Sequence, residues 1–357
     1  MSNDRFDAIV VGGGLAGLSA AQVMAEAELE VLLIEKGNYS GAKNVTGGRI
    51  YIHSLEKILP GFAERAPLER KITRERLTVM ENGQPVTVEY DSACLSAPGG
   101  DSYSVLRGRF DKWLAEQTEE SGVMQVCGVR ADDLIVRGGK VCGVISGDEE
   151  MEADAVVLAD GVNSLLGQKV GLRSELSPGQ VAVGVKEVVE LGEEAVNARF
   201  GLCSGEGLAW MFQGYSVGDG LCDGFLYTNG ASVSVGVSVK VEDIGGMADC
   251  VPQLMEDFKN SAELAPLLTG GKTVEYSAHL IPEDGEMLPK LVGDGVLLAG
   301  DAAGLAANLG FTIRGMDLAV ESGRLAAERI STVRRSATVR SENCSEKKNW
   351  EQQSMQR

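Results

Sequence analysis

Three glycines near the N-terminus have the spacing of a dinucleotide-binding turn. Gly12, Gly14 and Gly17 give the pattern G-x-G-x-x-G. In such a pattern the first glycine permits a tight turn, the second lets the backbone approach a pyrophosphate, and the third lets a helix pack closely on a strand. The N-terminus of the helix adds free N–H groups and the positive end of its dipole. The predicted binding segment is Gly12, Gly13, Gly14, Leu15, Ala16 and Gly17.

An acidic residue follows at the distance that this motif requires. Glu35 lies 18 residues after Gly17, at the end of the next apolar run. Its carboxylate would accept hydrogen bonds from an adenosine ribose, and its charge would repel a 2′-phosphate. The alternative is a glycine-rich turn followed by a surface glutamate.

A second acidic residue, Asp301, follows an apolar strand near the other end of the sequence. It stands in A-G-D-A-A-G, before an alanine-rich helical stretch. An aspartate at a strand end can accept hydrogen bonds from hydroxyl groups, and the helix dipole can stabilise negative charge on a reduced flavin. A glycine motif at the extreme N-terminus with this remote partner favours FAD over NAD. The alternative is an ordinary turn in which Asp301 caps the helix.

The elements around these residues predict an α/β fold. A strand at 6–11, a helix at 15–28 and a strand at 30–34 form a βαβ unit, whose strands must be parallel. Alternating β-type segments interrupt the α/β pattern. We therefore predict a Rossmann-like FAD-binding domain interleaved with a β-rich substrate domain, and the resemblance described below implies the glutathione-reductase type. The FAD-binding domain would take residues 1–48, 100–165 and 280–330, and the β-rich domain 49–99 and 166–279.

Composition excludes several classes of protein. The 33 Lys and Arg against 52 Asp and Glu give a net charge of −19, which would repel nucleic acid. The seven cysteines contain no C-x-x-C pair and the histidines number two, so we expect reduced thiols and no metal site. Without a long apolar stretch or room for a signal peptide before residue 6, we expect a cytoplasmic protein. Peripheral contact at the cytoplasmic face of a membrane stays open.

The C-terminal segment 331–357 differs from the rest. It holds six Lys or Arg and three Asp or Glu, hence +3, whereas the preceding residues sum to −22. Only six of its 27 residues are apolar. This composition predicts a solvated or disordered tail and not a packed element.

Further segments resemble the FAD-binding glutathione-reductase and hydroxylase-like flavoproteins. The block from Leu297 to Ala319 is similar to their second FAD signature, which implies that Asp301 binds the ribitol and that the following glycines, Gly310 among them, lie at the cofactor. R-x-x-F-D-x-x-L, beginning at Arg107, implies an arginine that reaches the cofactor, and the Asp160-Gly161 pair implies a strand end near FAD. The alternatives are a surface salt bridge for Arg107 and simple turn chemistry for Asp160.

More specifically, the chain resembles electron-transfer flavoprotein:quinone oxidoreductases of the FixC type. The similar segments are Ser40 to Tyr51, Pro60 to Arg70, Ala182 to Glu187, Gly224 to Asn229, Tyr276 to His279 and Asn308 to Ala319. The resemblance implies electron transfer from an electron-transfer flavoprotein through FAD, with a ferredoxin-like partner, toward a quinone or a low-potential acceptor. It also implies a possible flavin face made by Gly47, Gly48, Arg49 and His279. A plain loop and a packed strand histidine are the alternatives.

Two departures from this family matter. The four-cysteine module of the mitochondrial relatives is missing, so an iron–sulfur cluster would have to come from a separate ferredoxin-like protein. The similarity also fades after about residue 330. Two rival functions therefore remain: a flavoenzyme like geranylgeranyl reductases, which reduces isoprenoid lipids, and a non-catalytic flavin-binding remnant. An aromatic hydroxylase is disfavoured, because Ser164 to Gln168 lacks the arginine expected after the Asp-Gly pair.

Overall fold

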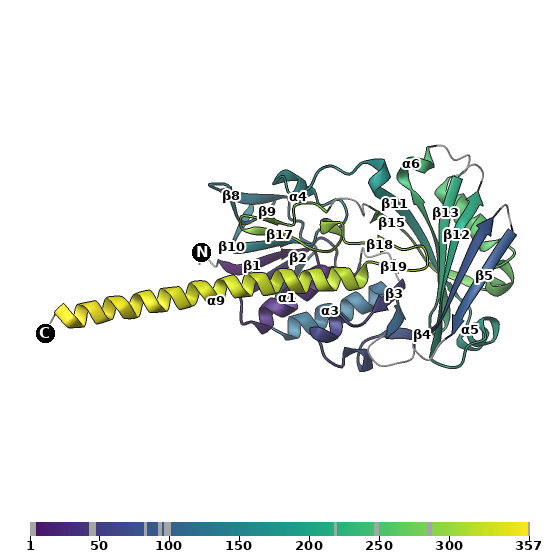
Figure 1. Ribbon diagram of the computed structural model, residues 1–357, viewed down its shortest axis with the longest axis horizontal. Coiled ribbons are helices and arrows are strands. Elements are labelled where there is room, and N and C mark those ends of the chain that lie inside the picture. Colours follow the sequence, from purple (N-terminus) through teal and green to yellow (C-terminus); the bar gives the residue numbers. More distant parts are fainter. Residues whose placement is uncertain are drawn as a thin grey trace.

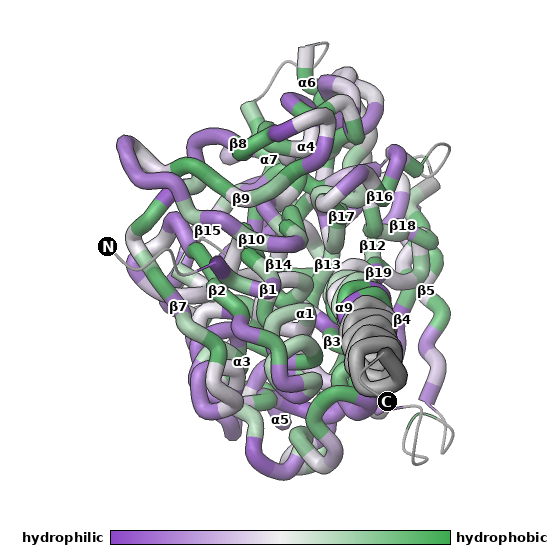
Figure 2. Tube along the Cα trace, turned by 90° about the vertical axis from the view of Figure 1, so that its left-hand side faces the viewer, coloured by the Kyte–Doolittle hydropathy of each residue, from purple (hydrophilic) through white to green (hydrophobic). Residues whose placement is uncertain are grey.

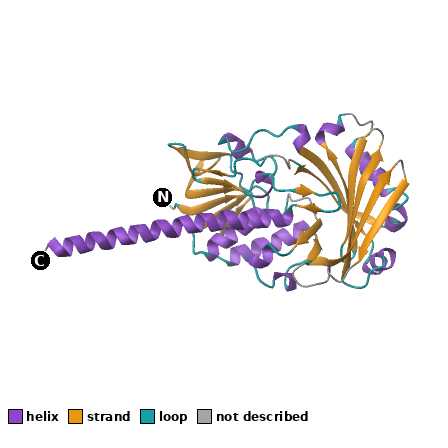
Figure 3. Cartoon of the chain, in the orientation of Figure 1, coloured by secondary structure: helices purple, strands orange, loops and turns teal. Residues whose placement is uncertain are grey.

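The strands of this chain gather into two large sheets. The computed structural model describes residues 5–42, 48–81, 84–91, 95, 101–217, 220–245, 250–283 and 288–355. One sheet has eight strands and the other nine, and Figures 1 and 3 show them as two groups side by side. The chain is thus a mixed α/β protein, as predicted.

The eight-stranded sheet has a parallel centre with β1 in the middle. Its order is β16-β17-β10-β1-β2-β7, and β1 pairs in parallel with both β2 and β10. Ala8, Ile9 and Val10 of β1 are fully buried, as a strand covered on both faces requires. The antiparallel hairpin β8–β9 continues from β10. The bounds are β1 Phe6–Val11, β2 Val31–Glu35, β7 Met124–Cys127, β8 Asp133–Arg137, β9 Lys140–Ser146, β10 Glu149–Leu158, β16 Val292–Gly293 and β17 Val296–Leu298.

Three helices cover one face of this sheet. Apolar side chains of α1, α3 and α9 form one core with the strands, and residues of β8, β9 and α4 pack on the opposite face. Figure 2 shows α1 and the strands around it as mainly hydrophobic and the outer loops as mainly hydrophilic. The helices are α1 Leu15–Glu26, α3 Arg107–Glu120, α4 Leu165–Lys169 and α9 Met316–Met355.

The turn between β1 and α1 depends on glycine in the predicted way. A Cβ on Gly17 would lie 1.9 Å from the carbonyl oxygen of Gly12. Gly12 has φ +107°, and its Cβ would lie 2.2 Å from the carbonyl oxygen of Ala159. Because both obstacles are backbone atoms, a side chain at either position would displace α1 or β10.

The nine-stranded sheet presents one face to its own helices. Its order is β15-β11-β14-β13-β12-β4-β6-β3, with β5 paired to β4. Side chains of α5 and α7 form a core with this face, while the opposite face carries a smaller apolar cluster that includes Phe225 and Tyr227. The strands are β3 Gly48–Tyr51, β4 Leu68–Glu81, β5 Gln84–Asp91, β6 Ser102–Val105, β11 Val181–Glu190, β12 Glu206–Val217, β13 Gly220–Thr228, β14 Ser232–Lys240 and β15 Lys272–Pro282.

Short elements complete the fold. Between β4 and β5, Asn82 and Gly83 lie outside the described residues. The remaining helices are α5 Glu193–Phe200, α6 Val241–Ile244, α7 Val251–Lys259 and α8 Ala265–Leu268. The 3₁₀ turns are η1 Leu55–Lys57, η2 Phe62–Glu64, η3 Pro178–Gln180 and η4 Gly300–Ala303, and the last hairpin pairs β18 Ala307–Asn308 with β19 Ile313–Arg314.

The C-terminal segment differs from its prediction. We expected disorder after residue 330, but α9 continues as one helix to Met355 and extends beyond the body of the molecule (Figure 1). The first turns of α9 pack on α1, which supplies the helix nucleus. No glycine or proline follows Gly323, so nothing in the local sequence stops the helix.

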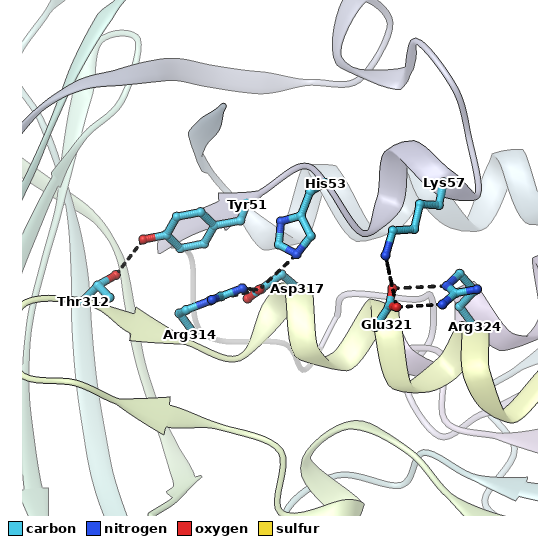
Figure 4. A network of polar contacts seen from close by, with 8 residues as sticks. All are labelled: Tyr51, His53, Lys57, Thr312, Arg314, Asp317, Glu321 and Arg324. Atoms are coloured by element: carbon cyan, nitrogen blue, oxygen red, sulfur yellow. Dashed lines mark hydrogen bonds and ion pairs between the residues drawn. The ribbon is translucent and has the colours of Figure 1, made fainter. Parts of the chain in front are cut away.

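The start of α9 is tied to η1 by a charged cluster (Figure 4). Glu321 accepts hydrogen bonds from Lys57 Nζ at 3.1 Å and from Arg324 Nη2 at 2.7 Å. These hydrogen bonds, chiefly that from Arg324, lower the pKa of Glu321 to about 2. Its ionised form is therefore favoured in the folded state.

We expect Glu321→Gln to lower the free energy of unfolding at pH 7 by about 0.5 to 1 kcal/mol, the usual size for a solvent-accessible cluster. Because the folded-state pKa is depressed, this contribution is present above the ordinary value of 4.5 and is lost as the pH falls toward 2. Urea unfolding at pH 7 and pH 4 should show the gap between variant and wild type shrinking at pH 4. The exposed Glu116→Gln serves as control, and a gap that stays constant would contradict the assignment.

Candidate functional site

A cavity of about 600 Å³ lies where the two sheets face each other. The eight-stranded sheet contributes the segments that follow the carboxyl ends of β1, β2, β7, β10 and β17, and the nine-stranded sheet contributes β3, β13 and β15. Ligands of open parallel sheets bind beyond the carboxyl ends of the strands. The cavity is therefore in the position expected for a cofactor site.

The N-terminal motif forms one part of the wall. Gly12, Gly14, Leu15 and Ala16 line the cavity, together with Glu35. The described residues that line it do not include Gly13 and Gly17, whose roles are local. The Gly13 N–H donates to Glu35 Oε2 at 2.7 Å, and Gly17 packs against Gly12.

Two backbone hydrogen bonds fix the Glu35 carboxylate. Besides the bond from Gly13, Oε1 accepts the Gly37 N–H at 2.5 Å. Each carboxylate oxygen has a further lone pair for a ligand hydroxyl. These oxygens are free to accept the hydrogen bonds that the role predicted for Glu35 requires.

Asp160 and Gly161 stand at the carboxyl end of β10 and line the cavity. Oδ1 of Asp160 is buried and has no hydrogen-bond partner among the described residues. Burial raises the pKa of this carboxyl group, and the nearby Ser164 hydroxyl and backbone N–H groups oppose the shift. A buried acceptor without a partner is costly, so Asp160 suits a ligand that brings a hydroxyl or amide donor.

Asp301 lies in η4, whose Gly300 is next to Ala16 of the N-terminal motif. Burial raises the pKa of its carboxyl group, and the nearby His279, Arg107 and Arg173 oppose the shift. Arg173 Nη1 donates to the backbone carbonyls of Asp301 and Ala302, both at 2.8 Å. Arg173 thereby holds the turn that carries Asp301. We did not predict this role, since no motif surrounds Arg173 and 128 residues separate it from Asp301.

Arg107 lines the cavity from the first turn of α3. Its Nε and Nη2 atoms donate to the two carboxylate oxygens of Asp111, at 2.6 and 2.7 Å. The Arg107 side chain is 11% exposed and that of Asp111 is fully buried. The alternative of a surface salt bridge is therefore wrong, because the salt bridge that Arg107 forms is buried beside the cavity and does not lie on the surface.

Two further arginines flank Tyr51 at the cavity. The guanidinium carbons of Arg49 and Arg314 lie 4.4 and 5.0 Å from the centre of the Tyr51 ring. Each arginine has its own carboxylate, Glu75 for Arg49 and Asp317 for Arg314. Figure 4 shows Arg314 directed at Asp317 below Tyr51, whose hydroxyl is 2.9 Å from Thr312 Oγ1.

The remaining predicted flavin-face residues have different outcomes. Gly48, Arg49 and His279 line the cavity, and burial lowers the pKa of His279, which favours its neutral form. Gly47 lies outside the described residues. Gly310 is not among the residues that line the cavity. It has φ +77° in the β18–β19 hairpin, close to Gln213.

Several lining residues carry no motif and were not predicted. They include Lys36 and Arg130, which follow the carboxyl ends of β2 and β7, and Phe225 and Tyr227 of β13. The ends of β2 and β7 could have been chosen from the topology of the parallel sheet alone. In the described part of the chain, no group of three His, Cys, Asp or Glu side chains is placed to hold a metal ion.

Comparison with known proteins identifies the family. Residues 7–57 match the model of the FAD binding domain family. Protein FixC of Escherichia coli O157:H7 is 52% identical over 338 residues, which cover 94% of this chain and 79% of that protein. The chain belongs to the FixC family. A second FixC-family relative, named "Probable electron transfer flavoprotein-quinone oxidoreductase YdiS" in Escherichia coli K12, is 51% identical, with 92% of this chain and 76% of that protein covered.

Solved structures agree with the fold of this FixC-family chain. A geranylgeranyl bacteriochlorophyll reductase-like protein of Thermoplasma acidophilum superposes with a TM-score of 0.74 at 20% identity, covering 94% of this chain and 80% of that one. A myxobacterial FAD-dependent chondrochloren halogenase gives a TM-score of 0.74 at 20% identity, and the superposition covers 93% of this chain and 76% of the halogenase chain. The fold is therefore that of FAD-dependent oxidoreductases and halogenases.

The cofactor of this FixC-family chain is FAD, and the chain is an FAD-dependent oxidoreductase. The cavity fits that cofactor, because it joins a glycine turn at a helix N-terminus to the buried Asp160 Oδ1, which has no hydrogen-bond donor among the described residues. Within the described ranges, none of the helices combines the length and apolar composition needed to cross a membrane.

Proposed function

We propose that this FixC-family protein binds FAD along the whole cavity and passes electrons from an electron-transfer flavoprotein to a quinone. The observation that carries the proposal is one continuous cavity lined by both predicted motifs, by Gly12, Gly14 and Glu35 at one part and by Arg107 and Asp301 at another. The relative with 51% identity, whose printed name includes electron transfer flavoprotein and quinone, supports this choice of donor and acceptor.

Each part of the cavity would have its own task. The N-terminus of α1, left open by Gly12 and Gly14, would hold the pyrophosphate. Glu35 would accept hydrogen bonds from the adenosine ribose, while Asp160 and Asp301 would accept them from further hydroxyl groups of FAD.

Positively charged groups would surround the flavin end. Arg49, Arg107 and Arg314 line the cavity, and a carboxylate holds each of them. When bound, FAD supplies the redox chemistry, taking up electrons from one partner and giving them to another. The protein orients the cofactor and excludes water, and no side chain is required as an acid or a base.

We further propose a cytoplasmic location, peripheral contact with a membrane where the acceptor is a quinone, and a separate ferredoxin-like protein as a second partner. The sequence contains no C-x-x-C pair, so an iron–sulfur cluster would be brought by that protein. We also propose the division into 1–48, 100–165 and 280–330 for the FAD-binding domain, with 49–99 and 166–279 for the β-rich domain. The likeness to the geranylgeranyl reductase-like protein is one of fold and favours no lipid substrate.

The test is an anaerobic titration of purified, FAD-reconstituted protein with a reduced electron-transfer flavoprotein. We expect the flavin absorbance of this protein to bleach and to recover when a soluble quinone is added. Bound FAD that dithionite reduces but the electron-transfer flavoprotein does not would overturn the proposed donor. Reduction of an isoprenoid double bond instead would favour the geranylgeranyl-reductase-like alternative.

A further inference from the structure

Lys186 lies on the sheet face that forms one wall of the cavity. Across β11 and its neighbours, Lys186 pairs with Gly236 of β14, and Gly236 pairs with Phe225 of β13. Residues directly opposite each other in a sheet share a face, and Phe225 lines the cavity. The row therefore places Lys186 on the face of Phe225.

The other neighbour of β11 gives the same result. Lys186 pairs with Ser277 of β15, and two residues further His279 pairs with Gly184. Because side chains alternate along a strand, Lys186 and His279 share a face, and His279 lines the cavity. Lys186 thus lies between two cavity-lining strands.

Glycines occupy two of the positions next to Lys186 on this face, Gly236 and Gly184. A Cβ on Gly236 would lie 2.4 Å from the ring of Phe225, and a Cβ on Gly184 would lie 2.7 Å from Ile281. The side chains of Phe225 and Ile281, both of which line the cavity, lean over these glycines. Phe225 and Ile281 therefore form the cavity wall beside Lys186.

The ammonium group of Lys186 is buried and has one charged partner in an ion pair among the described residues. Its side chain is 3% exposed, and Nζ lies 3.0 Å from Glu275 Oε1, whose side chain is 48% exposed. Burial lowers the pKa of Lys186, the ion pair with Glu275 opposes the shift, and Arg107 adds to the lowering. Since Glu275 is partly in water and Lys186 is not, the positive charge acts on the cavity more strongly than the negative one.

We propose that the positive charge of Lys186 raises the reduction potential of bound FAD. Reduction brings negative charge into the cavity, and the ammonium group of Lys186 favours that charge. The inference rests on the proposed FAD site. A fixed cation in a water-poor wall stabilises developing negative charge without reorganisation. Glu275 sets how much of that charge acts on the cavity.

The test compares the reduction of FAD by dithionite, against a reference dye, in wild type, Lys186→Met, Glu275→Gln and Lys186→Arg. We expect the equilibrium constant for two-electron reduction to fall about tenfold in Lys186→Met, which is about 30 mV for a two-electron couple. In Glu275→Gln we expect a rise of about threefold. Lys186→Arg keeps the charge and should stay within about twofold of wild type.

Opposite shifts of the reduction potential in Lys186→Met and Glu275→Gln distinguish this role from a structural one. A loosened site would shift the potential in the same direction in both variants. An unchanged potential in Lys186→Met, or a fall in Glu275→Gln, would overturn the inference. Should Lys186→Met fail to fold, Glu275→Gln and Lys186→Arg decide the matter alone. If the wild type does not bind FAD, the proposed function itself fails, which is a different result from bound FAD with an insensitive potential.

Discussion

Gly14→Val is expected to raise the dissociation constant for FAD at least about 100-fold, or about 2.8 kcal/mol, while leaving the fold intact. Gly14 is the N-cap of α1 with φ −85° and ψ −178°, a conformation open to any residue. It lines the cavity, so the valine side chain would occupy space intended for the pyrophosphate. Flavin fluorescence titration measures the loss, and circular dichroism checks the fold.

The matched control for this substitution is Gly245→Val. Gly245 is exposed, has φ −66°, and a Cβ there meets nothing within 4 Å. Wild-type FAD affinity is expected for it. If Gly14→Val bound FAD normally, the N-terminal motif would not be part of the FAD site. Gly12 and Gly17 are unsuitable for this test, because side chains there collide with backbone atoms and would damage the fold itself.

Arg107→Met is expected to destabilise the protein by about 3 kcal/mol, the size seen when one partner of a buried ion pair is removed. The substitution leaves the fully buried carboxylate of Asp111 without its bidentate partner. Urea unfolding of the FAD-free protein measures the loss. The ion pair of Arg137 with Glu152 offers a control, since Arg137→Met, with a side chain 54% exposed, should cost much less stability than Arg107→Met.

A second substitution separates stability from cofactor binding. Adding Asp111→Asn to Arg107→Met removes the buried charge that lost its bidentate partner, so at least half of the lost stability should return. The affinity for FAD should remain about tenfold below wild type, because Arg107 also lines the cavity. If affinity returns together with stability, Arg107 only supports the fold and does not contact the cofactor.

Local motifs were the predictable part of this molecule. The glycine turn, Glu35, Asp160 and Asp301 could be placed from the sequence because each follows a buried strand within a few residues, and the strand order of an α/β sheet brings such ends together. The pair of Arg107 with Asp111 could also have been found, since a spacing of four residues puts both on one helix face.

Residues that act across the fold could not be predicted. Arg173 reaches the Asp301 turn over 128 residues, and Lys186 takes its position from the pairing of three strands. Neither has a local signature. The C-terminal segment misled us for another reason, since its polar composition argues against packing while its lack of glycine and proline permits a helix. The domain boundaries stay a prediction.

The order of the strands in the parallel sheet has a consequence during protein synthesis. β1 pairs with β10, as in Phe6 with Ala153, and β10 pairs with β17, as in Val156 with Val296. Together the two pairings span nearly the whole chain. At about 5 to 20 residues per second, roughly 15 to 60 s pass on the ribosome between the appearance of β1 and that of β17. Until β10 appears, β1 has an unpaired apolar edge, and β10 then has one until β17 appears. Such edges can aggregate, so we expect the nascent chain to gain from chaperones because of where these strands lie along the chain.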